Sequence, residues 1–297
     1  MSRAWLEQRE RGTLVGLRAI TWITGTFGYG AGRLLLYPIC AYFLLFSVHA
    51  RRASHEFLSR VLGRRAGWRD TFRHYHTFAA SLLDRVLVLS GRSDGFDIRF
   101  HGLDTLRAEL GRGRGLLLLG SHLGSFEIIR AVADDKRELV VNIVMHEANA
   151  ENNRRWMREM APAIAPRIIA SGRVDTLLRA KECLDRGEAV AMLADRPLGS
   201  ADISTEVFFG HAAQFPRGPL RSAAVLQVPV ILFFALHRGP RSYDVHFELL
   251  AERVGTSRAG RADAVACETR RFAERLEAYA RRAPYNWFNF YDFWSEA

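Results

Sequence analysis

His122 and Glu127 are the residues of this chain whose types and spacing best suit proton transfer. An imidazole can take a proton from a hydroxyl or an amine near neutral pH. A carboxylate on its other nitrogen would fix the tautomer and stabilise the imidazolium that forms. On one continuous α-helix, however, two residues five positions apart lie about 140° apart around the axis. The pair therefore needs a bend in the chain between them.

The surrounding residues predict such a bend. The apolar run Leu116–Leu119 is typical of a short buried strand, and the glycines and serines that follow favour a turn. Ser125 is a good N-cap for a helix reaching about Val132. Glu127 would then lie in the first helical turn, where the helix dipole favours the ionised carboxylate. The alternative is a surface histidine in a glycine-rich loop beside an ordinary first-turn glutamate.

The pattern His-x4-Glu after an apolar strand resembles the signature of the glycerolipid acyltransferase superfamily. Its glutamate version is similar to the bacterial branch of lipid A lauroyl/myristoyl acyltransferases. Further segments follow in the order of that family's blocks: Gly187–Arg196, Val207–Gly210 with Phe215–Arg221, and Val228–Phe234. The resemblance runs from about Trp5 to Trp294 and so covers nearly the whole chain.

Two positions depart from related patterns. Arg217 stands where glycerophosphate-type enzymes usually carry the glutamate of an F-P-E-G block, so no role of that acid carries over. The second member of the catalytic pair is glutamate, which points away from the phosphatidic-acid branch. Both departures leave the acceptor open more than the chemistry.

The resemblance implies a membrane-associated acyltransferase on the cytoplasmic face of the bacterial inner membrane. It would move a fatty acyl group from an acyl thioester, carried by acyl carrier protein rather than coenzyme A, to a hydroxyl or amine of a lipid or glycolipid. His122 would be the general base and Glu127 would hold it. Backbone N–H groups near Gly124 and Ser125 would receive the oxyanion. We expect no metal and no cofactor beyond the thioester co-substrate.

Arginines after the predicted strands are candidates for anion contacts, because a guanidinium binds phosphate or carboxylate with two hydrogen bonds. Arg196, Arg217 and Arg221 would contact the phosphopantetheine of the carrier or a phosphorylated acceptor. The alternative for each is solvation or structural pairing. The remaining residues expected to bind substrate are Asn149, Arg154, Asp195 and Gly218.

Composition limits the class of protein. The 297 residues carry a net charge of +10, and 40 of the 42 basic residues are arginine. This charge suits anionic lipid, an acidic carrier protein or nucleic acid, although arginine-rich codon usage explains it as well. No basic module or readout motif supports the nucleic-acid reading, so we expect no nucleic-acid partner. A non-catalytic membrane scaffold of the same fold is the other alternative. Three scattered cysteines indicate a reduced, cytoplasm-facing body.

The N-terminal region is apolar. Between Ala19 and Val48 the only charged residue is Arg33, and arginines flank the stretch on both sides. We predict a membrane-associated helical segment over residues 1–52, as an interfacial hairpin or a tilted anchor, followed by an acyltransferase α/β domain over residues 53–297. The alternative is a long buried helix of a soluble protein.

The rest of the chain predicts an α/β fold, with a mainly parallel central sheet flanked by helices. Residues 53–89 have a helical period. Strands are expected at 96–100, 116–119, 139–145, 167–169, 189–194, 230–236 and 243–249, and further helices at 103–110, 151–160, 174–186, 219–226 and 262–282. Sites on such sheets lie beyond the carboxyl ends of strands, which would bring His122 and Asp195 to a common crevice. The aromatic block 285–294 is predicted to pack near it; the alternative is a membrane-interface belt.

Overall fold

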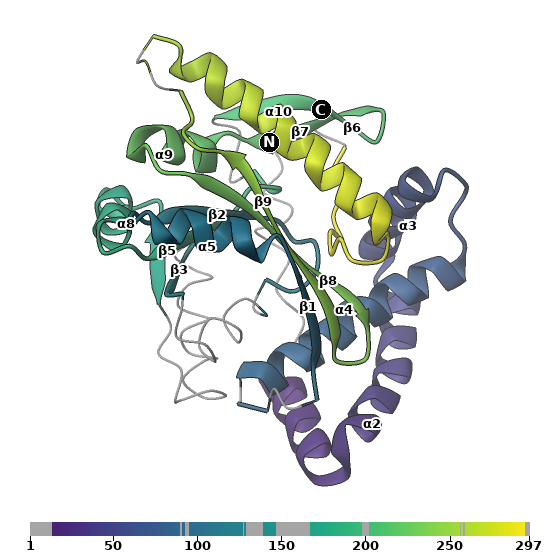
Figure 1. The fold of residues 1–297 in the computed structure, drawn as a ribbon. Coiled ribbons are helices and arrows are strands. Elements are labelled where there is room, and N and C mark those ends of the chain that lie inside the picture. The colour runs from purple at the N-terminus through teal and green to yellow at the C-terminus, as the bar shows by residue number, and fades with distance from the viewer. Residues whose placement is uncertain are drawn as a thin grey trace.

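A computed structural model shows how these elements are arranged (Figure 1). It describes residues 14–89, 91–92, 95–126, 128, 139–146, 167–197, 202–255, 257 and 259–294. The helix expected at 151–160 lies outside the described residues, as does nearly all of the helix expected after Ser125.

A seven-stranded sheet in the described part of the chain forms the centre of the fold. The strand order is β1-β9-β8-β2-β5-β3-β4, and every neighbouring pair is parallel except β8 and β9. The strands are β1 (Asp97–His101), β2 (Leu116–Gly120), β3 (Val141–His146), β4 (Ile168–Ser171), β5 (Ala189–Leu193), β8 (Val230–Gly239) and β9 (Ser242–Ala251). The predicted α/β fold with a mainly parallel sheet is confirmed.

Strand β2 shows why the sheet needs cover on both faces. Its four leucines are fully buried and point alternately to opposite sides. Leu117 and Leu119 join a core cluster with α3, α8, α9 and α10, whereas Leu116 and Leu118 join a second cluster beside α5. A run of apolar residues without polar alternation is what a strand buried on both faces requires.

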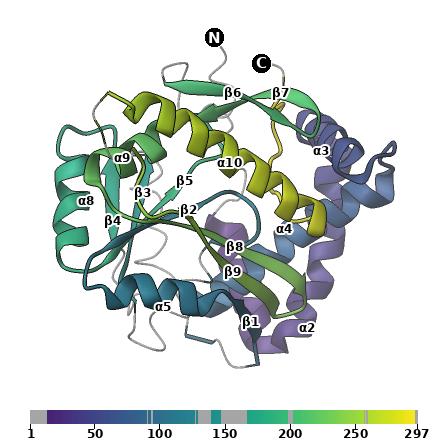
Figure 2. The ribbon, with the colours of Figure 1, turned by 45° about the horizontal axis from the view of Figure 1, so that its top comes forward.

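Helices α3, α8, α9 and α10 contribute to the cluster on one face and α5 to the cluster on the other. Figure 2 shows α8 and α9 toward the left end of the sheet and α2, α3 and α4 toward the right. Their bounds are α2 (Leu14–Phe46), α3 (Val48–Leu62), α4 (Trp68–Leu89), α5 (Leu103–Gly111), α8 (Thr176–Asp185), α9 (Gly218–Leu226) and α10 (Arg261–Arg282). The single helical stretch expected at 53–89 is wrong in one respect. Gly63, with φ of 63°, ends α3 in the left-handed conformation that glycine adopts readily.

A hairpin of β6 (Ile203–Phe208) and β7 (His211–Pro216) forms a separate two-stranded sheet that the sequence did not predict. Its turn residues Phe209 and Gly210 both have positive φ. That conformation suits a tight hairpin turn, but phenylalanine rarely adopts it. The hairpin packs its phenylalanines under α10 and the aromatic C-terminal residues.

Helix α2 packs along α4 and is interrupted at Gly28, where φ is 86°. Tyr29 donates a hydrogen bond to the buried Asp84 of α4 at 2.7 Å. Within the described residues, one helical stretch, Trp22–Phe46, is long and apolar enough by length and composition to cross a membrane. The division of the chain at residue 52 stays a prediction.

The register of the sheet positions the site. In β2 and β5, which are adjacent and parallel, Gly120 lies opposite Leu193, so the two strands end together. The chain leaving β2 then passes close to β8, where Gly124 bridges Ala235. Gly124 has φ of 78°, and a Cβ atom there would collide with the Ala235 carbonyl oxygen. Only glycine therefore allows this approach.

Replacing Gly124 with alanine should lower the free energy of unfolding by much more than the same change at Gly63. Both glycines have positive φ, which costs an alanine about 1 kcal/mol. An added Cβ at Gly63 meets nothing within 4 Å, so the Gly63→Ala variant measures the cost of the positive φ alone. Urea unfolding of both variants measures the difference, and equal losses would contradict the close packing of the loop on β8.

Candidate active site

His122 and Asp195 form a hydrogen-bonded pair at the carboxyl edge of the sheet. Each lies two residues beyond the end of its strand, β2 for His122 and β5 for Asp195. The Nδ1 atom of His122 is 2.9 Å from Oδ1 of Asp195, and the His122 backbone N–H donates to Oδ2 at 3.0 Å. The two predicted blocks thus meet at one point, although they are 73 residues apart in the chain.

The Asp195 carboxylate is completely buried. A third donor, the indole Nε1–H of Trp287, reaches its Oδ2 at 3.0 Å. Burial raises the pKa of the carboxyl, but the positive charge and hydrogen bonds of His122, with Arg196 nearby, outweigh that effect and lower the pKa from 3.8 to about 2. Asp195 is therefore an anion across the physiological pH range.

This geometry defines the protonation of the neutral imidazole. An ionised carboxylate only accepts hydrogen bonds, so Nδ1 of His122 carries the proton and Nε2 carries the lone pair. The His122 side chain is 31% exposed, whereas that of Asp195 is fully enclosed. Such an arrangement can serve as a general base with an orienting acid, because the acid holds Nδ1 and Nε2 carries the lone pair.

The C-terminal aromatic segment closes over this pair. Leu123 and Trp287 form a β-bridge, and the Phe288 N–H donates to the His122 carbonyl at 2.8 Å. Trp287 is fully buried, and its ring packs against Phe208. The predicted packing of this segment near the crevice agrees with these contacts. Sequence reasoning did not single out Trp287 as a partner of Asp195.

The expected oxyanion site is wrong. The N–H of Gly124 donates to the Asn286 carbonyl at 2.8 Å, and the N–H of Ser125 donates to the Ala235 carbonyl at 2.9 Å. Both amides bind backbone oxygens in the folded chain, because the loop must satisfy its own buried donors. They are not available to a reaction intermediate.

The other predicted site residues divide into three groups. Arg196, next to the pair, donates to the Phe288 carbonyl at 2.7 Å. Arg217 donates to the Ile203 carbonyl, and Arg221 pairs with Asp202; both therefore brace the hairpin junction, where Gly218 starts α9. Three lie outside the described residues: Glu127, Asn149 and Arg154.

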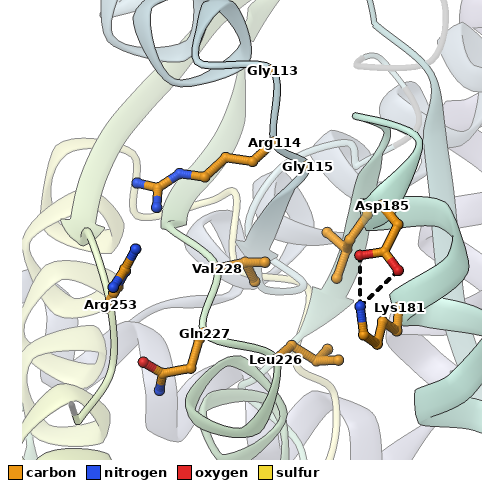
Figure 3. Close-up of a pocket in the computed structure, with 10 residues that line it drawn as sticks. Gly113, Arg114, Gly115, Lys181, Asp185, Leu226, Gln227, Val228 and Arg253 are labelled. Atoms are coloured by element: carbon orange, nitrogen blue, oxygen red, sulfur yellow. Dashed lines mark hydrogen bonds and ion pairs between the residues drawn. The ribbon is translucent and has the colours of Figure 1, made fainter.

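A separate cavity of about 330 Å³ lies at the amino end of β2 (Figure 3). Arg114, Arg253 and Gln227 line it, together with Lys181, which pairs with Asp185. Because β2 runs from this cavity toward His122, the cavity is at the opposite edge of the sheet from the histidine–aspartate pair. It does not belong to the candidate active site.

The described fold is an α/β sheet covered on both faces, with a hydrogen-bonded histidine–aspartate pair at its carboxyl edge. Residues 75–296 match the family of bacterial lipid A biosynthesis acyltransferases. The match spans most of the chain and includes His122, Asp195 and the aromatic segment 285–294 that packs over them. The protein belongs to this family.

Two curated relatives match over a smaller part. They are probable lipid kinases, described as YegS-like, from Pseudomonas aeruginosa strains UCBPP-PA14 and PAO1. Each is 34% identical over 114 residues, which is 37% of this chain and 35% of the relative. The chain thus matches about a third of the length of these relatives.

The buried pair predicts a distinct acid sensitivity. Because the folded-state pKa of Asp195 is depressed to about 2, its contribution to stability is complete above pH 4 and is lost as the pH falls toward 2. The free energy of unfolding should fall by about 2 kcal/mol more over this interval in the wild type than in Asp195→Asn. Denaturant titrations at several pH values measure it; parallel curves would show that Asp195 titrates normally.

Proposed function

We propose that this protein is an acyltransferase that moves a fatty acyl group from an acyl thioester to a hydroxyl or amine of a lipid acceptor, with His122 as the general base. The observation that carries the proposal is the 2.9 Å contact between His122 Nδ1 and the buried Asp195 carboxylate. Membership of the lipid A acyltransferase family supports the reaction class.

The reaction requires one proton to move twice. Nε2 of His122 takes the proton from the acceptor as its oxygen or nitrogen attacks the thioester carbonyl carbon. The tetrahedral intermediate then collapses, the carbon–sulfur bond breaks, and the imidazolium returns the proton to the departing thiolate. The products are an ester or amide and a free thiol. Asp195 stabilises the imidazolium between the two steps.

Two carboxylates are then candidates to support His122. Asp195 occupies Nδ1, so in our proposal it orients the ring. Glu127 is the second carboxylate, and in our proposal its role is to balance the charge of the imidazolium. This assignment modifies the simple histidine–glutamate pair that the spacing indicated.

The donor and the location form part of the same proposal. The likeness to the lipid A branch favours acyl carrier protein over coenzyme A as donor, and an acidic carrier also suits a chain of net charge +10. The apolar stretch Trp22–Phe46, with exposed Trp22, Leu34 and Phe46, supports association with the bacterial inner membrane from the cytoplasmic face.

We propose that Asn149, Arg154 and Arg196 contact the substrates. The partial likeness to probable lipid kinases does not extend to the whole chain and carries no argument for phosphoryl transfer.

Replacing His122 with alanine should reduce turnover by about a thousandfold or more, because the proton acceptor is lost. The assay follows free thiol release from acyl carrier protein in the presence of a bacterial lipid extract, with mass spectrometry of the acylated lipid. Omission of the extract measures thioester hydrolysis. Full activity of the variant would rule out the proposed reaction.

Asp195→Asn and Glu127→Gln separate the two carboxylates. An asparagine beside Nδ1 favours the wrong tautomer, so Asp195→Asn should lower kcat nearly as much as loss of the base. Glu127→Gln removes a charge while Asp195 still holds Nδ1, and it should cost about ten- to a hundredfold less. The reverse order would return the orienting role to Glu127.

Carrier and coenzyme donors should differ in their salt dependence. With acyl carrier protein as donor, kcat/KM should fall by about tenfold between 20 and 300 mM salt, because surface charges steer the carrier. With acyl coenzyme A of the same chain length, the fall should be smaller. Steady-state rates with both donors decide this, and a preference for coenzyme A at every salt concentration would contradict the assignment of the carrier.

A further inference from the structure

A buried chain of hydrogen bonds runs from α3 to the catalytic pair. Ser54 Oγ on α3 is 2.8 Å from His74 Nδ1 on α4, and His74 Nε2 is 2.9 Å from the Trp287 carbonyl oxygen. The indole of Trp287 then reaches Asp195, which holds His122. Ser54, His74, Trp287 and Asp195 are each completely buried.

The direction of each hydrogen bond follows from chemistry. A carbonyl oxygen only accepts, so His74 must donate from Nε2, and its Nδ1 must accept from the Ser54 hydroxyl. Burial lowers the pKa of His74 to about 4, against the smaller opposing effect of the Trp287 carbonyl, so the ring is neutral at physiological pH. Trp287 can only donate from its indole. Every donor in the chain thus has one defined acceptor.

The position of Trp287 gives this chain a functional meaning. Its indole N–H binds Oδ2 of Asp195, the same oxygen that accepts the His122 backbone N–H, while Oδ1 faces the imidazole. A carboxylate with hydrogen bonds to both of its oxygens cannot rotate. Its Oδ1 atom is therefore fixed in the plane and at the distance that His122 Nδ1 requires.

We propose that Trp287 is a positioning residue for His122, acting through Asp195, and that His74 and Ser54 hold the Trp287 backbone in register. The proposal rests on the function proposed above. In this proposal catalysis depends on how α3 and α4 pack against the rest of the fold, because Ser54 lies on α3 and His74 on α4. Trp287 does not touch the reacting atoms.

The test is Trp287→Phe, which keeps an aromatic ring and removes the N–H donor. With acyl carrier protein as donor and lipid extract as acceptor, kcat should fall by about tenfold while KM changes by less than about twofold. A carboxylate relieved of one donor attracts the imidazolium more strongly. The acid limb of the kcat/KM profile should therefore move upward by about half a pH unit.

Trp294→Phe is the matched control. Its indole N–H binds the Phe208 carbonyl at 3.4 Å, and its ring lies in the same aromatic cluster, but it makes no contact with Asp195. This variant should keep the wild-type kcat and pH profile. If Trp287→Phe does not fold, a tryptophan analogue with sulfur in place of the N–H at position 287 preserves the ring shape and gives the same test.

Ser54→Ala tests the far end of the chain. It leaves His74 Nδ1 without its donor and should lower kcat about two- to threefold. Ser59→Ala on the same helix should not, because the Ser59 hydroxyl donates to the His55 carbonyl and accepts from the Ala66 N–H, away from His74 and Trp287. The positioning role would be overturned if the variant without the N–H at position 287 kept the wild-type kcat and pH profile while His122→Ala was inactive. Activity of His122→Ala would instead defeat the proposed function itself.

Discussion

The burial of one ionised carboxylate organises this protein. Asp195 has no solvent exposure, and an unpaired charge at such a position would cost several kcal/mol. The fold compensates with three donors from two distant segments: the ring and backbone of His122, and the indole of Trp287. Each donor also fixes the geometry of the pair. The contacts that satisfy Asp195 are therefore the same ones that would orient His122 in the proposed reaction.

The sheet makes that arrangement possible. Adjacent parallel strands β2 and β5 end in register, and the two residues of the pair follow those ends at equal distance. The β2 loop is then drawn onto β8, where Gly124 lies directly on a carbonyl oxygen. The Gly124 and Ser125 amides of this loop donate to backbone carbonyl oxygens. These two backbone hydrogen bonds hold the histidine loop in place, and in the proposed reaction the oxyanion would be stabilised by groups other than the Gly124 and Ser125 amides.

Some of this could be predicted from the sequence, and the reasons differ by residue. The four leucines of β2 show no polar alternation, so a strand buried on both faces was evident. The β6–β7 hairpin was not, because its turn is Phe-Gly instead of Asn-Gly, and because Val207 is exposed while Glu206 is buried beside Arg270. Spacing suggested a partner for His122 five residues away. It could not reveal that an acid 73 residues distant takes Nδ1, since that contact depends on strand order.

The break in α2 at Gly28 affects how the apolar helix can meet a bilayer. The uninterrupted arm from Tyr29 to Phe46 has 18 residues, or about 27 Å of helix at 1.5 Å per residue. A hydrocarbon core is about 30 Å thick, so even an upright arm falls slightly short, and any tilt increases the mismatch. Lying along the headgroup boundary carries no such penalty. In the membrane association proposed above, the interruption at Gly28 would therefore place this arm along the headgroup boundary, with its aromatic side chains among the headgroups.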